Sequence, residues 1–66
     1  MFGIVDAVEH IDGIEVVYRR DGEERRRVFS QDDLITMGIN PLDLLQAPEG
    51  FAIDPERGVV TEKMLS

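Results

Sequence analysis

Five arginines lie close together in the first half of the chain. They are Arg19, Arg20, Arg25, Arg26 and Arg27, and they make up five of the seven basic residues in a 66-residue chain of net charge −7. A guanidinium group is planar, stays charged and donates paired hydrogen bonds to carboxylates and phosphates. The cluster therefore suggests two kinds of binding partner, an acidic protein surface or the phosphates of a nucleic acid.

Acidic residues are interleaved with these arginines. Asp21, Glu23 and Glu24 lie in the same run and reduce its net charge. The sequence pI is about 4.4, and an acidic body repels polyanions. The nearby aromatic residues Tyr18 and Phe29 fit core positions better than base-stacking positions. We therefore expect a solvated hairpin whose charges are neutralised locally, and nucleic acid is the alternative partner.

His10 is the only histidine, and histidine is the side chain that ordinarily titrates near neutral pH. A catalytic histidine needs a nucleophile or a second acid–base group beside it. The hydroxyl-bearing residues, apart from Tyr18, are Ser30, Thr36, Thr61 and Ser66. Ser30 suits a helix cap and Ser66 lies at the terminus, so we expect His10 to be a surface residue near Glu15 and the chain not to be an enzyme.

The carboxylates are spread along the chain, and the pairs Asp32–Asp33 and Asp54–Glu56 do not match a calcium-binding loop. A helix start and a turn explain these pairs. The glycines are isolated and form no phosphate-binding loop, and the chain contains no cysteine for a disulfide or a typical structural zinc site. We expect no catalytic residue, no metal, no cofactor and no small-molecule substrate.

The length fits a single small domain over residues 1–66, with residues 62–66 as a frayed tail or a strand extension. So short a chain buries little surface, which favours association with a partner or with itself. The first residues lack a basic signal-peptide region, and no run of apolar residues is long enough to span a membrane. We expect a complete small gene product that is soluble and cytoplasmic and does not bind membranes.

Two Asp-Gly dipeptides, at positions 12–13 and 21–22, are typical of tight β-hairpin turns. They predict a three-stranded antiparallel meander over residues 2–11, 14–20 and 23–29. If each dipeptide forms a two-residue loop, Ile11 lies opposite Ile14 and Arg20 opposite Glu23. Oppositely charged pairs across the second hairpin would then stabilise its tip.

This register divides the apolar residues between two faces of the meander. In the first strand, one face carries Ile4, Asp6, Val8 and His10, and the other carries Val5, Ala7, Glu9 and Ile11. Neither of these faces is cleanly apolar. The predicted core face carries Val5, Ala7, Ile11, Ile14, Val16, Tyr18 and Phe29. The reverse face carries Val8, Val17 and Val28 among charged neighbours.

Ser30 is a suitable N-cap for a helix that ends at Gly38, and Asn40 followed by Pro41 starts a second helix. Short strands are predicted at residues 51–53 and 59–61, joined by a turn at 54–58. The predicted fold is α+β and mostly β: a meander, a short helical connection and a C-terminal β-hairpin. It forms a small curled sheet or an SH3-like, partly open barrel, or alternatively a flat sheet with the helical segment packed on one face.

A helix of about two turns cannot bury every apolar residue near it on one stripe. Ile39, Leu42 and Leu45 are therefore candidate partner-binding residues beside the five arginines. The function that we expect is a protein–protein interaction module, either a small regulator or inhibitor or a subunit of a homo-oligomeric assembly. The alternative is a nucleic-acid-binding protein that uses the arginine hairpin at residues 19–27.

Overall fold

The computed structural model describes residues 1–63. Of residues 62–66, expected as a frayed tail or a strand extension, Glu62 ends the last strand and residues 64–66 lie outside the described residues. The first three strands are β1 (Phe2–His10), β2 (Gly13–Arg20) and β3 (Glu23–Phe29). The helices α1 (Gln31–Thr36) and α2 (Pro41–Gln46) follow, then a short 3-10 turn, η1 (Pro48–Gly50). The last strands are β4 (Phe51–Asp54) and β5 (Val59–Glu62).

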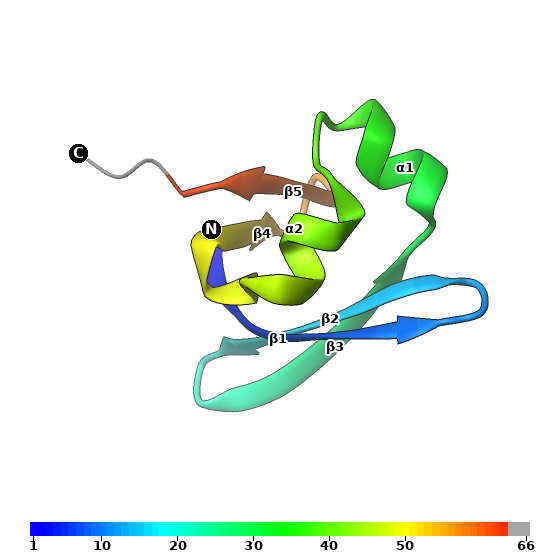
Figure 1. Cartoon of the computed structure of the whole chain (residues 1–66). Coiled ribbons are helices and arrows are strands. Elements are labelled where there is room, and N and C mark those ends of the chain that lie inside the picture. Colours follow the sequence, from blue (N-terminus) through cyan, green and yellow to red (C-terminus); the bar gives the residue numbers. More distant parts are fainter. Residues whose placement is uncertain (64–66) are drawn as a thin grey trace.

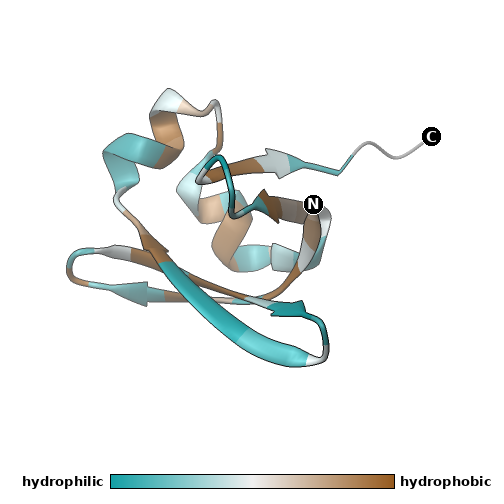
Figure 2. Ribbon diagram, turned by 180° about the vertical axis from the view of Figure 1, so that it is seen from behind, coloured by the Kyte–Doolittle hydropathy of each residue, from teal (hydrophilic) through white to brown (hydrophobic). Residues whose placement is uncertain are grey.

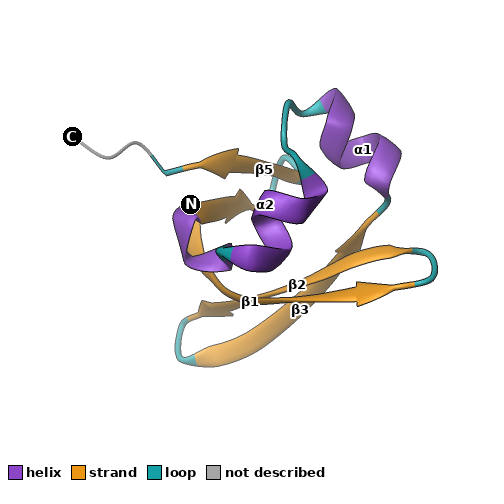
Figure 3. Ribbon diagram, viewed as in Figure 1, coloured by secondary structure: helices purple, strands orange, loops and turns teal. Residues whose placement is uncertain are grey.

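The five strands form one antiparallel sheet in the order β3-β2-β1-β4-β5. The sheet is not closed, because no pairing joins β3 to β5 among the described residues. Both helices lie on the same side of the β1–β2–β3 part of the sheet, beside the β4–β5 hairpin (Figures 1 and 3). The prediction of a small, mostly β fold with a short helical connection is confirmed.

The second hairpin has the predicted register. Arg20 lies opposite Glu23, and at the other end of the ladder Ile14 lies opposite Phe29. Asp21 and Gly22 have φ values of 54° and 80°, the pair of positive angles that a type I′ turn requires. The Asp-Gly dipeptide therefore sits at the centre of this turn as expected.

The first hairpin differs from the prediction. Its turn consists of Ile11 and Asp12, so His10 pairs with Gly13, and Glu9 rather than Ile11 lies opposite Ile14. Gly13 belongs to β2, with φ at 151°, and a Cβ atom there would collide with the backbone of Phe29 on β3. Glycine is required here by the close approach of two strands and not by the turn itself.

A β-bulge in β1 overturns the predicted assignment of faces. The register shifts between Ile4 and Asp6, so Val5 is an extra residue and the alternation of side chains breaks there. Ile4, expected on the reverse face, is buried in the core, and Ala7 packs partly against it. Val5 and Ile11, expected in the core, are exposed at 54% and 102%.

The helix boundaries follow the predicted caps. The hydroxyl oxygen of Ser30 accepts a hydrogen bond of 3.0 Å from the backbone N–H of Asp33, and Asn40 caps α2 in the same way. Gly38 has φ at 82°, and the chain leaves α1 through paired hydrogen bonds from Gly38 to Ile35 and from Ile39 to Leu34. These two bonds form a Schellman motif.

The core lies between the helices and the inner face of the sheet. Its fully buried side chains come from both layers, so the helices and the sheet fold as one unit. The buried cluster is Ile4, Ile14, Val16, Tyr18, Phe29, Leu34, Ile39, Leu44, Phe51, Ile53 and Val60.

Candidate functional site

The arginines of β3 are paired with acids of the same strand. Arg25 donates to Glu23 at 3.0 Å, and Arg26 donates to Glu24 at 2.9 Å. Residues two apart in a strand share a face, which explains the spacing. The cross-strand ion pairs expected from Arg20–Glu23 and Arg19–Glu24 are not the ones formed, although the backbone register is as predicted.

Arg26 also belongs to a chain of charges on the outer side of the sheet. Its Nη1 lies 3.5 Å from Oε1 of Glu15, and the same oxygen lies 3.3 Å from Nε2 of His10. The hydrogen bond that Arg26 donates to Glu24 and the negative charge of Glu24, followed by the charge of Glu15, raise the pKa of Arg26 above its usual value. Arg26 thus remains charged and held by carboxylates, and His10 lies beside Glu15 as the sequence indicates.

Arg20 and Arg27 reach across the molecule to the turn between β4 and β5. Nη2 of Arg20 lies 2.8 Å from Glu56, and Nη1 of Arg27 donates to the carbonyl oxygen of Pro55 at 3.0 Å. The guanidinium carbon of Arg20 also lies 5.2 Å from the centre of the Phe2 ring. Both arginines therefore hold the curled sheet together and are not free to bind a ligand without loss of these contacts.

Arg19 makes no ion pair with any of residues 1–63, and it is exposed. The five predicted arginines thus do not converge on one site. Arg25 and Arg27 lie in the rows of the inner face, opposite Tyr18 and Val16, while Arg26 lies on the outer face. Figure 2 shows β3 at the edge of the sheet, hydrophilic along most of its length and hydrophobic at its end.

Two exposed valines lie on the outer face of the sheet, the face away from the helices. Val8 of β1 and Val28 of β3 lie opposite the same residue of β2, Glu15. Val8 is 40% exposed and Val28 is 51% exposed, whereas Val17 between the flanking strands is buried. The predicted reverse face is present, and its apolar side chains surround the Glu15 charge.

The free edge of β1 is a feature that the sequence analysis missed. β4 pairs with β1 only at Phe2 and Gly3, so within the described chain the remainder of β1 pairs with a strand only on the β2 side, although η1 and α2 also contact β1. The N–H of Ala7 donates to the carboxylate of its neighbour Asp6 at 2.9 Å. The one sequence signal was the lack of a clean apolar face over residues 2–11, which is typical of a bulged strand.

The edge strand and its turn carry three exposed apolar side chains, Val5, Val8 and Ile11. We call residues 5–11 the β1 edge. Large apolar side chains that gather on a strand edge favour contact with another chain, because the edge has no paired strand and its apolar side chains are exposed to water.

The helix residues proposed as partner contacts separate into three environments. Ile39 is buried at 4% exposure and belongs to the core, because the Schellman motif turns it inward after α1. Leu45 is half-buried against the core, and Leu42 is 64% exposed. Of these three residues, Leu42 alone presents most of its side chain to solvent.

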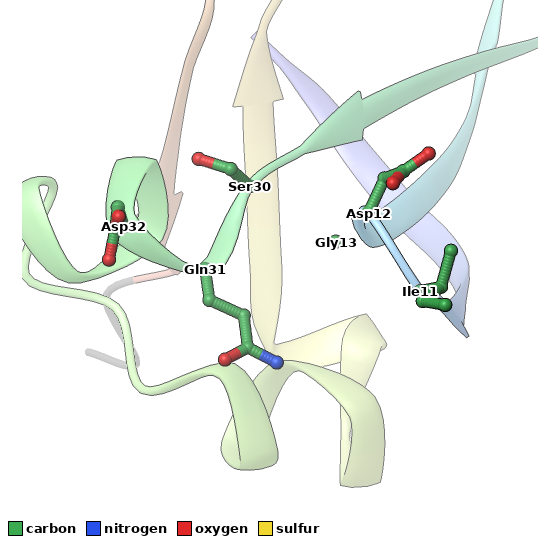
Figure 4. Close-up of a pocket in the computed structure, with 6 residues that line it drawn as sticks. All are labelled: Ile11, Asp12, Gly13, Ser30, Gln31 and Asp32. Carbon is green, nitrogen blue, oxygen red and sulfur yellow. The ribbon is translucent and has the colours of Figure 1, made fainter.

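A surface depression of about 250 Å³ lies between the first hairpin and the start of α1. Its lining is Ile11, Asp12, Gly13, Ser30, Gln31 and Asp32. Figure 4 shows that the carboxylates of Asp12 and Asp32 point in different directions. The Ser30 hydroxyl is already used as a helix cap, so these side chains do not converge on a common ligand position.

No group of three or more metal-ligating side chains gathers among residues 1–63. In the same part of the chain, no helix is long and apolar enough to cross a membrane. The chain matches no family model, and comparison with curated proteins and with solved structures found no match.

Proposed function

We propose that the protein is a non-enzymatic protein–protein interaction module, a small acidic regulator or a subunit of a homo-oligomeric assembly. The observation that carries this proposal is the β1 edge, where an unpaired strand coincides with the exposed Val5, Val8 and Ile11. An added strand would satisfy the backbone groups of this edge, and its side chains would cover the apolar ones.

The charge distribution supports binding at the β1 edge rather than at the arginine hairpin. Four of the five arginines contact acids or a backbone carbonyl of the same chain, so a polyanion would have to displace those contacts. The β1 edge carries Asp6, Glu9 and His10 beside its apolar residues, and this mixture of polar and apolar side chains is typical of a surface that binds a protein.

The proposed location is the cytoplasm, and the proposed fold type is an SH3-like, partly open barrel.

The proposal is tested by cross-linking the tagged chain in the cells that produce it. Val8→Lys places a charge at the middle of the β1 edge, and Arg25→Ala changes the hairpin on the other side of β2. We expect discrete cross-linked species with the wild type and with Arg25→Ala, and their loss with Val8→Lys. Species that persist in Val8→Lys, or the absence of any with the wild type, would contradict the proposal.

A second candidate function, nucleic-acid binding, is supported by the exposure of Arg19 and Arg25 near the hairpin tip. Such binding weakens steeply with salt, because it releases counterions from the phosphates. A labelled single-stranded or duplex oligonucleotide at about 50 mM salt would test it by fluorescence anisotropy. Retention that disappears when Arg19 and Arg25 are replaced by alanine would favour this function.

A further inference from the structure

We propose that the partner of the β1 edge is a second copy of this chain, paired antiparallel about a two-fold axis at Val8. The proposal rests on the proposed interaction function and names the partner of that surface. The two sheets would join into one continuous sheet, with the helices of both copies on the same side.

The backbone of β1 offers the hydrogen-bonding groups that this pairing needs. In an antiparallel ladder, successive residues point their N–H and C=O groups alternately to the two neighbouring strands. His10 and Gly13 close a two-residue turn as a hydrogen-bonded pair, so Val8 and His10 point their groups to β2, whereas Ala7 and Glu9 point theirs to the free edge. The Ala7 N–H meets the Asp6 carboxylate there. With Val8 on the axis, Ala7 of each copy faces Glu9 of the other as a hydrogen-bonded pair.

The side chains of the edge are self-complementary in this register. Val8 lies opposite Val8 of the second copy, at a position without backbone hydrogen bonds, where side chains approach most closely. Asp6 lies opposite His10, which brings a carboxylate to an imidazole. At each end of this ladder, the bulge residue Val5 of one copy lies near Ile11 in the turn of the other, so all three exposed apolar residues of the edge gain apolar neighbours.

Other two-fold registers are less favourable. An axis at Ala7 places Val5 opposite Glu9 and Asp6 opposite Val8, so Val5 and Val8 both face a carboxylate. An axis at Glu9 places two like charges directly opposite each other, which is destabilising. Of these three registers, only the axis at Val8 matches apolar side chains with apolar ones and the Asp6 carboxylate with the His10 imidazole.

The other long edge strand, β3, is a poorer surface for self-pairing. The register that matches its glutamates with its arginines places Arg25 opposite Arg25. Its Arg27 is also engaged with Pro55 of the same chain. Charged edge strands are a common means of preventing such pairing.

The paired segment is short, so the dimer is expected to be weak and concentration-dependent. In the monomer the Asp6 carboxylate occupies the Ala7 N–H, and pairing would exchange this bond for a backbone bond to the second copy. We expect a dissociation constant on the order of 10 µM to 1 mM.

Sedimentation equilibrium of the purified chain, from about 10 µM to about 1 mM, tests the proposal. The expected result is a mass that rises from the 7.5 kDa of one chain toward twice that value. Val8→Lys should remain monomeric, because it places two ammonium groups on the axis. Val28→Lys, which changes the matched valine on the other side of Glu15, should dimerise as the wild type does.

A wild-type chain that stays monomeric to about 1 mM would overturn the homodimer. The same holds if Val28→Lys abolishes the dimer as completely as Val8→Lys does, since the interface would then be the outer face and not the edge. If Val8→Lys does not fold, hydrogen exchange of the wild-type Glu9 amide decides: its protection must increase with protein concentration. If the chain does not dimerise but is still cross-linked to another protein, the homodimer is refuted and the proposed interaction function stands. If the chain neither dimerises nor is cross-linked to any protein, both proposals are refuted.

Discussion

Arg27 donates a hydrogen bond of 3.0 Å to the carbonyl oxygen of Pro55 and so joins β3 to the β4–β5 turn. The guanidinium also lies over the ring of Phe29, 5.6 Å from its centre. Since β3 and β5 are the two outer strands of an unclosed sheet, this contact links its two ends. An arginine that resembles a binding residue in the sequence thus has a structural role.

Arg27→Ala should destabilise the fold by about 1 kcal/mol, because it removes a charge-assisted hydrogen bond and a cation–π contact. Arg25→Ala on the same strand removes only an exposed ion pair with Glu23 and should cost less than about 0.5 kcal/mol. Urea denaturation followed by circular dichroism measures both. Equal effects of the two substitutions would refute the structural role of Arg27.

Gly13→Ala should destabilise the protein by more than about 3 kcal/mol, or prevent folding. The added Cβ would collide with the backbone of Phe29, and the φ of 151° at position 13 is unfavourable for alanine. Gly50→Ala is the control, because a Cβ there meets nothing within 4 Å. Its thermal midpoint should stay close to that of the wild type, and a comparable drop would show that the close approach at Gly13 is not the cause.

The leucines of α2 provide a second matched pair. Leu44 is fully buried, so Leu44→Ala should cost about 2–5 kcal/mol through lost apolar contacts and the cavity left behind. Leu42 is 64% exposed, and Leu42→Ala should change the stability by less than about 0.5 kcal/mol. The thermal midpoints of the two variants should therefore differ clearly. A large loss of stability in Leu42→Ala alone would show that Leu42, and not Leu44, faces the core.

The arginine hairpin should bind nucleic acid weakly or not at all. At about 50 mM salt, where phosphate contacts are strongest, we expect no anisotropy change with a labelled oligonucleotide at micromolar protein. The reason is that Arg26 is held by Glu24 and Glu15. Tight binding with a steep salt dependence would instead support the nucleic-acid alternative.

The sequence was sufficient where local chemistry decides the structure. Asp21 and Gly22 supply the two positive φ angles of their turn, and the ladder of the second hairpin follows from it. Ser30 and Asn40 cap their helices through their own side chains. These features depend on residues within four positions of one another, so a sequence reading can identify them.

The sequence does not predict the features that depend on contacts between distant segments. The first Asp-Gly dipeptide has the same composition as the second, yet it does not form the centre of a turn, and its Gly13 is required by the close approach to Phe29. β1 pairs with β4 before the bulge at Val5 and with β2 alone after it. No local sequence pattern specifies the position of this bulge. The contact of Arg27 with Pro55 and the free β1 edge both require the curvature of the whole sheet, which no single segment encodes.

The central claim, that this protein binds through the β1 edge and not through the arginine hairpin, is tested most directly by amide NMR spectra recorded over a dilution series. We expect concentration-dependent shifts for residues 5–11 and unchanged signals for residues 19–27. Shifts confined to residues 19–27 would contradict the account.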